Sequence, residues 1–307
     1  MPFTETFTIK PVPPFNLDLT AQIFGSGDTH VRSYIGGVFQ QVFQVNENHV
    51  LAKLTNKGTT EQPLLTIELH SNRPIASTDK QEALQAIKRI FSLDLDLNIF
   101  YKDVENDHVM RQITPQLYGY RFTTTLTVFE SLVDAIAEQQ ISIKVARIIE
   151  ERLAVKFGEK LEIEKETFFA FPTPNNLAEA CISDIQGVGL SKRKAEYIYN
   201  AAKMIVDSKL DLQQMKKEAD AKQVIAELDA LKGVGVWTAE LTMLRGMHRW
   251  DVLPADDFGI RRAISAYYCS GSPIKTAEAR EIAKAWGKWR GLAAFYLIVA
   301  EVKGIAV

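Results

Sequence analysis

The sequence of 307 residues is poor in cysteine, with only Cys181 and Cys269. An iron-sulfur cluster needs four ligands and a disulfide framework needs several pairs, so the chain has too few thiols for either. We expect both cysteines to be reduced and buried. The sequence therefore predicts a protein with no iron-sulfur cluster and no disulfide scaffold.

Long apolar runs are also missing. No stretch of about 18 uncharged apolar residues occurs, and the opening MPFTETFTIKPVPPF lacks a basic region followed by an apolar segment. We therefore expect no membrane partner and a cytoplasmic or nuclear location. Hydrophobic residues make up 46% and charged residues 24% of the chain, which is typical of a folded globular protein. The length suggests about two domains.

A strong positive charge is absent as well, because the formal net charge is -2. This counts against a protein that coats nucleic acid through bulk electrostatics, and any DNA contact must be local. Residues 186–204 form a locally positive segment with a single acidic residue, Glu196. Its basic residues are Lys192, Arg193, Lys194 and Lys203. A solvated helix face would show the same pattern.

The first third of the chain has strand patterns. Residues 32–45, 49–54 and 64–70 are rich in Val, Ile, Phe and Tyr and alternate roughly with polar residues, as in an antiparallel meander. Residues 80–93 have apolar side chains at helical spacing. Residues 1–115 are therefore predicted to form an α+β domain, an antiparallel sheet with a helix against it.

The pattern becomes helical from about residue 128. The segment 128–153 has apolar side chains on one helical face, namely Leu132, Ile136, Ile143, Ile149 and Leu153. Short loops and further helical patterns follow up to residue 301. Residues 116–307 are therefore predicted to be all α, with helices and loops only.

Two glycine turns echo each other, GVGLSKRKAEYI from residue 187 and GVGVWTAELTML from residue 233. Each pairs two glycines around an apolar residue and opens onto a helix, which leaves amide N–H groups pointing outward at a helix N-terminus. Such a turn can hold a phosphate. A tight link between packed helices uses glycine in the same way, so context must decide.

The context of the second turn is LKGVGVWTAELTMLRGMHRWDVLPADDFGIRRAI, residues 231–264. It resembles the helix-hairpin-helix DNA glycosylases, whose signature is an L-x-G-V-G hairpin, a helix, and then a proline and an aspartate opening the next helix. Residues 231–235, 237–246 and 254–257 match that order. Within this HhH-GPD family the likeness is greatest to bacterial 3-methyladenine DNA glycosylase II. The segments AIAEQQIS, FPTPNNLAEA and WGKWR have look-alikes there in the same order.

The resemblance implies an architecture and an activity. The N-terminal domain would be the TBP-like sheet of this family, and residues 116–307 would form two helical subdomains with the active-site cleft between them. The implied enzyme is a monomeric, monofunctional glycosylase for base excision repair. It would bind double-stranded DNA, flip a damaged base from the stack, and remove alkylated purines of the 3-methyladenine type by hydrolysis.

The resemblance maps the catalytic carboxylate to Asp257, because DDFGIRR places it where the family has an Asp-x-x-Ile pattern. Cleavage of an N-glycosidic bond builds positive charge on the sugar, which a fixed carboxylate stabilises. The neighbouring Asp256 is the near miss. One of the two is also expected to cap the helix that starts near Phe258, and both roles can coexist.

Trp237 stands where family members that cut the DNA backbone carry a lysine, which forms a Schiff base with the sugar. An indole cannot do this, so water is the implied nucleophile. Its electron-rich ring also suits stacking on a cationic base. The alternative is that Trp237 only fills the core between two helices. Further pocket walls are expected from Leu241 and Ile298, and from Phe24 or Ile23 of the N-terminal domain.

The DNA contacts follow from the same resemblance. Gln139 and Gln140 map to the segment that fills the gap left by the flipped base, although they could equally mark the exposed edge of a helix. The hairpin residues expected to contact DNA are Gly233, Val234, Gly235 and Thr238. A sodium or potassium ion is expected at the backbone carbonyls of Leu231, Gly233 and Val236, linked to a DNA phosphate. No cofactor is required.

Two other functions stay open. The first is an enzyme of the same fold that acts on oxidised or deaminated bases. The second is a non-catalytic protein that uses the hairpin only to bind DNA, which would not need an aspartate at position 257. A metabolic enzyme centred on the α+β domain has no support, because the first hundred residues hold no phosphate-binding loop, no Ser-His-Asp set and no paired acids.

Overall fold

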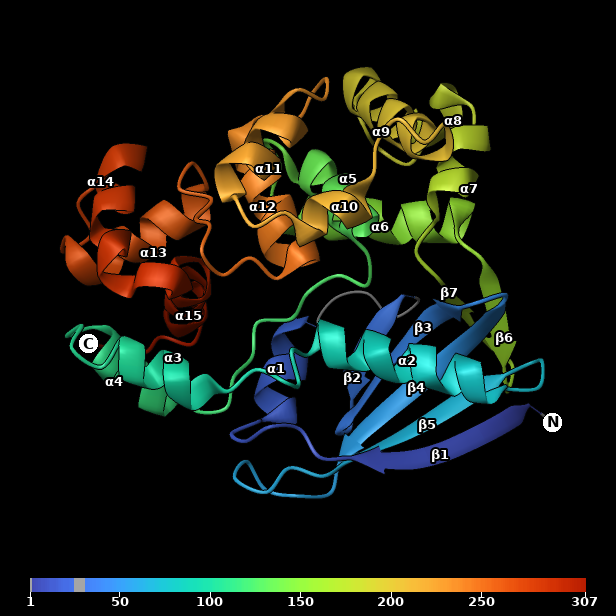
Figure 1. Cartoon of the computed structure of the whole chain (residues 1–307), viewed down its shortest axis with the longest axis horizontal. Helices are drawn as coiled ribbons and strands as arrows, with labels where there is room; N and C mark the ends of the chain where they lie inside the picture. The colour runs from blue at the N-terminus through green and yellow to red at the C-terminus, as the bar shows by residue number, and fades with distance from the viewer. Residues whose placement is uncertain (1, 25–30) are drawn as a thin grey trace.

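The computed structural model describes residues 2–24 and 31–307, except for the side chain of Phe24. A five-stranded antiparallel sheet forms the N-terminal part (Figure 1). Its spatial order is β1-β5-β4-β3-β2. The strands are β1 (Phe3–Ile9), β2 (Arg32–Ile35), β3 (Val38–Val45), β4 (Asn48–Asn56) and β5 (Leu65–Ser71). The predicted meander is confirmed, and β1 extends it beside β5 with Phe7 opposite Ile67.

Helices α1 (Leu17–Phe24) and α2 (Ser77–Ile90) supply apolar side chains to the core of the sheet domain. There Phe39 and Leu54 of paired positions on β3 and β4 meet Ile87 of α2. All three are fully buried. Each fully buried side chain of this kind contributes about 2 kcal/mol of hydrophobic stabilisation. The predicted helix at residues 80–93 is therefore present, although it begins at Ser77.

A second small sheet corrects the expectation that only helices and loops follow residue 128. Strands β6 (Lys160–Ile163) and β7 (Glu166–Phe169) form a hairpin whose turn residues, Glu164 and Lys165, have positive φ. Leu161, Ile163 and Phe168 form a separate apolar cluster with Val42 and Leu51 of the large sheet. Strands of four residues carry too short an alternation to be separated from a helical pattern.

The remaining chain is helical. The helices are α3 (Leu97–Asp103), α4 (Met110–Gln116), α5 (Val128–Glu138), α6 (Ile143–Phe157), α7 (Pro174–Glu179), α8 (Ile182–Gln186), α9 (Lys192–Val206), α10 (Leu212–Lys217), α11 (Ala221–Asp229), α12 (Val236–Met247), α13 (Phe258–Tyr268), α14 (Thr276–Ile282), the 3-10 helix η1 (Ala283–Trp289) and α15 (Arg290–Val302). Helices α3 and α4 lie beside η1 and α15 at the end of the chain (Figure 1). Phe100 of α3, for example, has its ring centroid 5.7 Å from that of Trp289.

The predicted amphipathic run 128–153 is two helices. Helix α5 ends at Glu138, and Ser142 caps α6 by accepting a hydrogen bond from the backbone N–H of Val145. Gln140, between them, has a φ of 56°. A serine N-cap favours a new helix start over continuation, and the left-handed residue turns the chain. The corner at residues 139–142 follows from these two features.

Helices α5 and α12 approach closely because Gly246 has no side chain. A Cβ atom at this position would lie 2.9 Å from the Cα of Val128 and 2.9 Å from the Cβ of Ser131. Atoms at this separation overlap, so only glycine fits without displacing a helix. Helix α12 is thereby held against α5.

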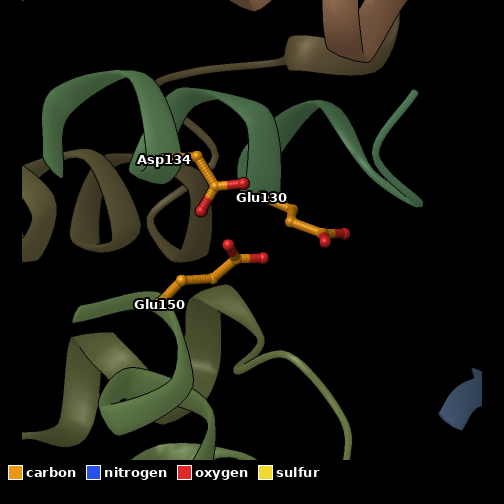
Figure 2. Close-up of side chains that lie close together, drawn as sticks. All are labelled: Glu130, Asp134 and Glu150. Atoms are coloured by element: carbon orange, nitrogen blue, oxygen red, sulfur yellow. The ribbon is translucent and has the colours of Figure 1, made fainter. Parts of the chain in front are cut away.

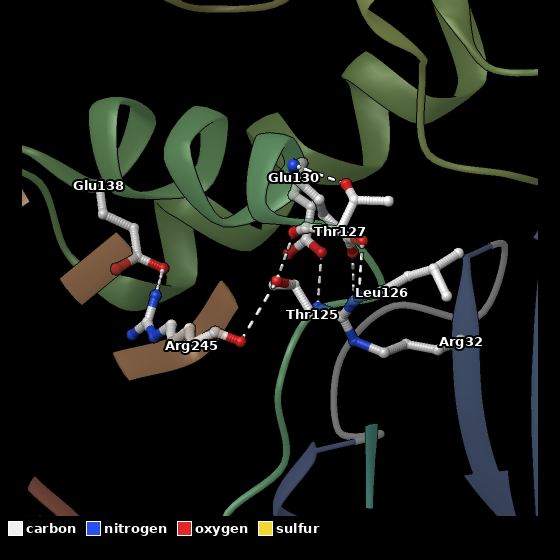
Figure 3. A network of polar contacts seen from close by, with 8 residues as sticks. Arg32, Thr125, Leu126, Thr127, Glu130, Glu138 and Arg245 are labelled. Carbon is white, nitrogen blue, oxygen red and sulfur yellow. Dashed lines mark hydrogen bonds and ion pairs between the residues drawn. The ribbon is translucent and has the colours of Figure 1, made fainter. Parts of the chain in front are cut away.

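Arg32 of β2 ties the sheet domain to α5 and α6. One guanidinium nitrogen donates to Glu150 at 2.5 Å and the other lies 3.9 Å from Glu130. Glu130 also accepts a hydrogen bond from the backbone N–H of Leu126 at 3.0 Å (Figure 3). Both carboxylates are buried, so Arg32 offsets a desolvation cost that the acids would otherwise carry alone.

Asp134 completes a buried acidic cluster with Glu130 and Glu150. Carboxylate oxygens of the three lie within 4.8 Å of one another, and the groups face each other in Figure 2. Burial raises the pKa of Glu130 to about 7, with Arg32 opposing and Glu150 adding to the shift. Burial, followed by repulsion from Glu150 and Glu130, raises the pKa of Asp134 well above its ordinary value. The cluster therefore retains protons near neutral pH.

Two smaller expectations have clear outcomes. Cys181 is exposed and Cys269 is half-buried, and both are free thiols, so the expectation that they are buried is wrong. Cys181 immediately precedes α8 at a surface corner, where burial is not available. Among the described residues, no helix is both long and apolar enough to cross a membrane.

The cluster predicts a pH-dependent effect of Glu130→Gln. The folded-state pKa of Glu130 is raised, so its contribution to stability is fully present below its ordinary value near 4.5 and is lost as pH rises through about 7. Glutamine imitates the protonated acid at every pH. We expect the unfolding free energy of the variant, relative to wild type, to rise between pH 5 and pH 8 in urea titrations.

Glu82→Gln on the exposed side of α2 is the matched control. It should show the same difference from wild type at both pH values. A pH-independent difference for Glu130→Gln would contradict the shifted protonation of the cluster.

Candidate active site

The glycine turn between α11 and α12 is shaped by one close contact. Gly233 has a φ of 87°, and a Cβ atom there would lie 2.0 Å from the ring of Tyr197 on α9. Both observations require glycine. Val234 is buried and donates its backbone N–H to the carbonyl of Leu231 at 3.0 Å. Gly235 is exposed and begins α12 as its N-cap. The turn is a rigid corner that presents the start of α12.

Gln139, just after the end of α5, holds this turn through two hydrogen bonds. Its side-chain Nε2 donates to the carbonyl of Gly233 at 2.9 Å and to the hydroxyl of Thr238 at 3.0 Å. The ammonium of Lys194 on α9 donates to the carbonyls of Ala137 at 2.9 Å and of Gln139 at 2.6 Å. These bonds join the end of α5, the turn and α9 into one unit.

These contacts change the expected roles of two residues. Thr238 is only 2% exposed, so it is shielded from a DNA contact and instead holds Gln139. The amide of Gln139 is already bonded within the protein, which makes it a support for the hairpin. Gln140 is exposed beside it. Of the two glutamines, Gln140 is the one free to reach outward.

The carboxylate of Asp257 is fixed by two donors from different helices. Asp257 is the N-cap of α13, where its Oδ1 accepts from the backbone N–H of Ile260 at 2.9 Å. Its Oδ2 accepts from the indole Nε1 of Trp237 at 3.2 Å. Both donors, and the positive end of the helix dipole, stabilise negative charge on this carboxylate. Asp257 therefore caps α13 and is also in contact with Trp237.

Asp256 is engaged elsewhere. It accepts hydrogen bonds from Thr276, at the start of α14, and from Arg261 at 3.4 Å. The loop from Pro254 to Asp257 is closed by a hydrogen bond from the backbone N–H of Asp257 to the carbonyl of Pro254 at 2.9 Å. Proline and aspartate thus form the short loop that the motif predicts, and only the second aspartate meets Trp237.

The other expected pocket residues lie in different surroundings. Leu241, one helical turn after Trp237 on α12, is 2% exposed. Ile298 of α15 is partly buried against the helical core. Ile23 of α1 is also half-buried there, whereas the side chain of Phe24 lies outside the described part of the chain. Trp237 itself is half-buried.

The sequence did not predict an ion pair between α5 and α12. Arg245 of α12 contacts Glu138 of α5 at 2.7 Å, and both side chains are mostly buried (Figure 3). Burial lowers the pKa of Arg245, but Glu138, Asp134 and Asp257 outweigh this and raise it. The pair fixes the end of α5 to α12. The one available signal was a pair of charges within otherwise apolar helical segments.

The three hairpin carbonyls expected to bind a cation are partly used. The carbonyl of Leu231 accepts from Val234, that of Gly233 accepts from Gln139, and Val236 begins α12. Each carbonyl oxygen has two lone pairs, so the first two retain one acceptor site each. Neutral carbonyl oxygens suit a hard cation without transition-metal chemistry. The donor set is therefore compatible with sodium or potassium.

The fold and the site together define a class of protein. A glycine hairpin begins a helix that carries an indole, and this indole contacts the aspartate that caps the next helix. A sheet domain precedes these elements in the chain. This is the arrangement of a base-excision DNA glycosylase. The chain belongs to the family described as HhH-GPD superfamily base excision DNA repair protein, whose model matches residues 133–288. The model of the 8-oxoguanine DNA glycosylase N-terminal domain matches residues 16–132.

Named relatives support this assignment. The DNA-3-methyladenine glycosylase of Bacillus subtilis is 26% identical over 75% of this chain and 75% of its own length. DNA-3-methyladenine glycosylase 2 of Escherichia coli is 27% identical over 72% of each chain. The structure of 3-methyladenine DNA-glycosylase from Archaeoglobus fulgidus superimposes with a TM-score of 0.85 at 26% identity, covering 98% of this chain and 100% of that one. The predicted fold class and family are confirmed.

The hairpin geometry predicts opposite outcomes for two glycines. Gly233→Ala would force a strained φ and a clash with Tyr197, so it should displace the turn. We expect a loss of thermal stability and a roughly tenfold or larger loss of affinity for a duplex that contains an abasic-site analogue, measured by fluorescence anisotropy.

Gly235→Ala is the control for stability. A Cβ atom there meets nothing within 4 Å, and its φ of -100° is open to any residue. Its melting temperature should stay close to that of wild type. Equal destabilisation by both substitutions would contradict the contact between Gly233 and Tyr197.

Proposed function

We propose that this DNA glycosylase is monofunctional and removes alkylated purines of the 3-methyladenine type from double-stranded DNA, in the cytoplasm of a prokaryote or in a nucleus. One observation carries the proposal. The position beside the catalytic aspartate is occupied by the indole of Trp237, which donates a hydrogen bond to Asp257. An indole cannot form a Schiff base with the sugar, so hydrolysis by water is the reaction that fits.

Asp257 would act on the sugar of the flipped nucleotide. The N-glycosidic bond breaks and its electron pair leaves with the base, so a cationic alkylated base departs as a neutral molecule. Positive charge develops on the sugar opposite the carboxylate, where it is stabilised. Water then adds to the sugar carbon, and its proton passes to the Asp257 carboxylate. A base that leaves readily needs little general-acid assistance.

Substrate preference would follow from Trp237. An aromatic face attracts a cationic base more than a neutral one, by on the order of 1 kcal/mol when desolvated. Leu241, one turn further along α12, is only 2% exposed, so it would pack beneath the pocket and not against the base. The names of the relatives from Bacillus subtilis, Escherichia coli and Archaeoglobus fulgidus agree with this class of substrate.

The DNA would be held at two places. Gly233, Val234 and Gly235 would present the start of α12 to a phosphate, with sodium or potassium at the nearby carbonyls. Gln140, exposed at the corner between α5 and α6, would fill the gap left by the flipped nucleotide. If the cation takes part, duplex affinity should be lower in tetramethylammonium chloride than in potassium chloride at equal ionic strength, and equal affinity would exclude it.

A second candidate is removal of oxidised purines. The match of residues 16–132 to the 8-oxoguanine DNA glycosylase N-terminal domain is the observation that favours it. That match concerns the sheet domain and the first helices, whereas Trp237 and Asp257 lie outside it. The chemistry of these two residues favours the alkylated substrate.

One panel of duplexes distinguishes the two candidate functions. The duplexes carry 7-methylguanine, ethenoadenine, hypoxanthine or 8-oxoguanine. Under single-turnover conditions we expect release of an alkylated purine, strand cleavage only after alkali, and no covalent enzyme-DNA product with borohydride. Release of 8-oxoguanine with a borohydride-trapped product would overturn the proposal.

A further inference from the structure

A groove at the C-terminal end of α12 contains unused binding groups. It has a volume of about 400 Å³ and lies between α2, α10 and the loop that follows α12. This volume falls within the range of small-molecule sites, roughly 300–1,000 Å³. The lining residues with polar or aromatic side chains are Gln85, Lys88, Arg89, Ser92, Asp94, Lys216, His248 and Trp250.

The groove has a net positive lining. It contains the three cations Lys88, Arg89 and Lys216 against the single acid Asp94, and Lys88 pairs with Asp94 at 3.2 Å. Arg89 uses one nitrogen to donate to the carbonyl of Leu126 at 3.2 Å. The excess is therefore two positive charges, carried by Arg89 and Lys216.

Lys216 has no counterion within the described part of the chain. Its side chain is half-buried and forms no hydrogen bond or ion pair with any other residue in the described part of the chain. Burial, together with the nearby Arg89, lowers the pKa of Lys216 to about 8. A half-buried ammonium beside a guanidinium is a costly arrangement without an anion.

His248 and Trp250 close the groove. The Nε2 of His248 lies 2.9 Å from the hydroxyl of Thr124, which itself donates to the carbonyl of Arg89. Burial, with Lys216 and Arg89 nearby, lowers the pKa of His248 to about 4, so this ring is neutral at pH 7. The indole of Trp250 lies beside it, with ring centroids 5.7 Å apart. The wall is therefore aromatic and uncharged.

We propose that this groove binds the phosphate group of a small molecule, with Lys216 and Arg89 as its charged partners. A phosphate monoester dianion matches the two excess charges. The aromatic wall suits a ligand of nucleotide size. The groove is separated from the glycine hairpin by the length of α12, about 18 Å for its 12 residues. It is thus a site apart from Asp257.

The test measures binding of inorganic phosphate and of dAMP to the full chain by calorimetry, at constant ionic strength and pH 7. Wild type should bind at one site per chain. Lys216→Gln should weaken the affinity by roughly tenfold or more, because a charge-assisted contact is removed. Lys217→Gln, the exposed neighbour on α10, should leave it unchanged.

The two probes distinguish the source of the phosphate. Tighter binding of dAMP than of inorganic phosphate, with the difference lost in Trp250→Phe, supports a nucleotide ligand, whereas equal binding supports a free phosphate. Absence of binding to wild type, or an equal loss in both lysine variants, would overturn the proposal. It would also be overturned if Lys216→Gln weakened only the binding of duplex DNA, since the groove would then contact the DNA backbone.

Discussion

The geometry of the candidate active site depends on the carboxylate of Asp257, which accepts hydrogen bonds from two helices. Ile260 N–H comes from the helix that Asp257 itself caps, and Trp237 Nε1 comes from the helix that follows the glycine turn. A displacement of α12 relative to α13 would break the hydrogen bond from Trp237, which is the one that joins the two helices. The rest of the structure keeps α12 in place, since Gly246 permits close contact with α5 and Gln139 connects the end of α5 to the turn.

Helix α5 therefore links the two parts of the molecule. Near its start, Glu130 belongs to the buried cluster that Arg32 of the sheet domain enters. At its end, Glu138 pairs with Arg245 and Gln139 supports the hairpin. Buried charges of this kind add little net stability but are costly when mismatched. Their effect is to fix where α5 lies, and through it the position of the hairpin and Trp237.

Local sequence signals predicted the parts of the site that one segment contains. Gly233, Trp237 and Asp257 lie within 25 consecutive residues, and the resemblance of this segment to the helix-hairpin-helix DNA glycosylases identified the hairpin, the indole and the aspartate. The sheet and α2 followed from alternation and helical periodicity. The supporting contacts could not be predicted, because Gln139 and Arg32 meet their partners across 94 and 118 residues of sequence. Strands β6 and β7 were missed because four-residue strands give no clear period.

The most direct test of this account is a single-turnover double-mutant cycle on a duplex that contains ethenoadenine or 7-methylguanine. Asparagine keeps the helix cap, so Asp257→Asn should fold, bind DNA and lose roughly 10²-fold or more in rate. Trp237→Phe should lose roughly tenfold, because a hydrogen bond to a charged group is removed. In the Asp257→Asn background that second loss should largely disappear. Independent, additive losses, or full activity of Asp257→Asn, would contradict a carboxylate held in position by the indole.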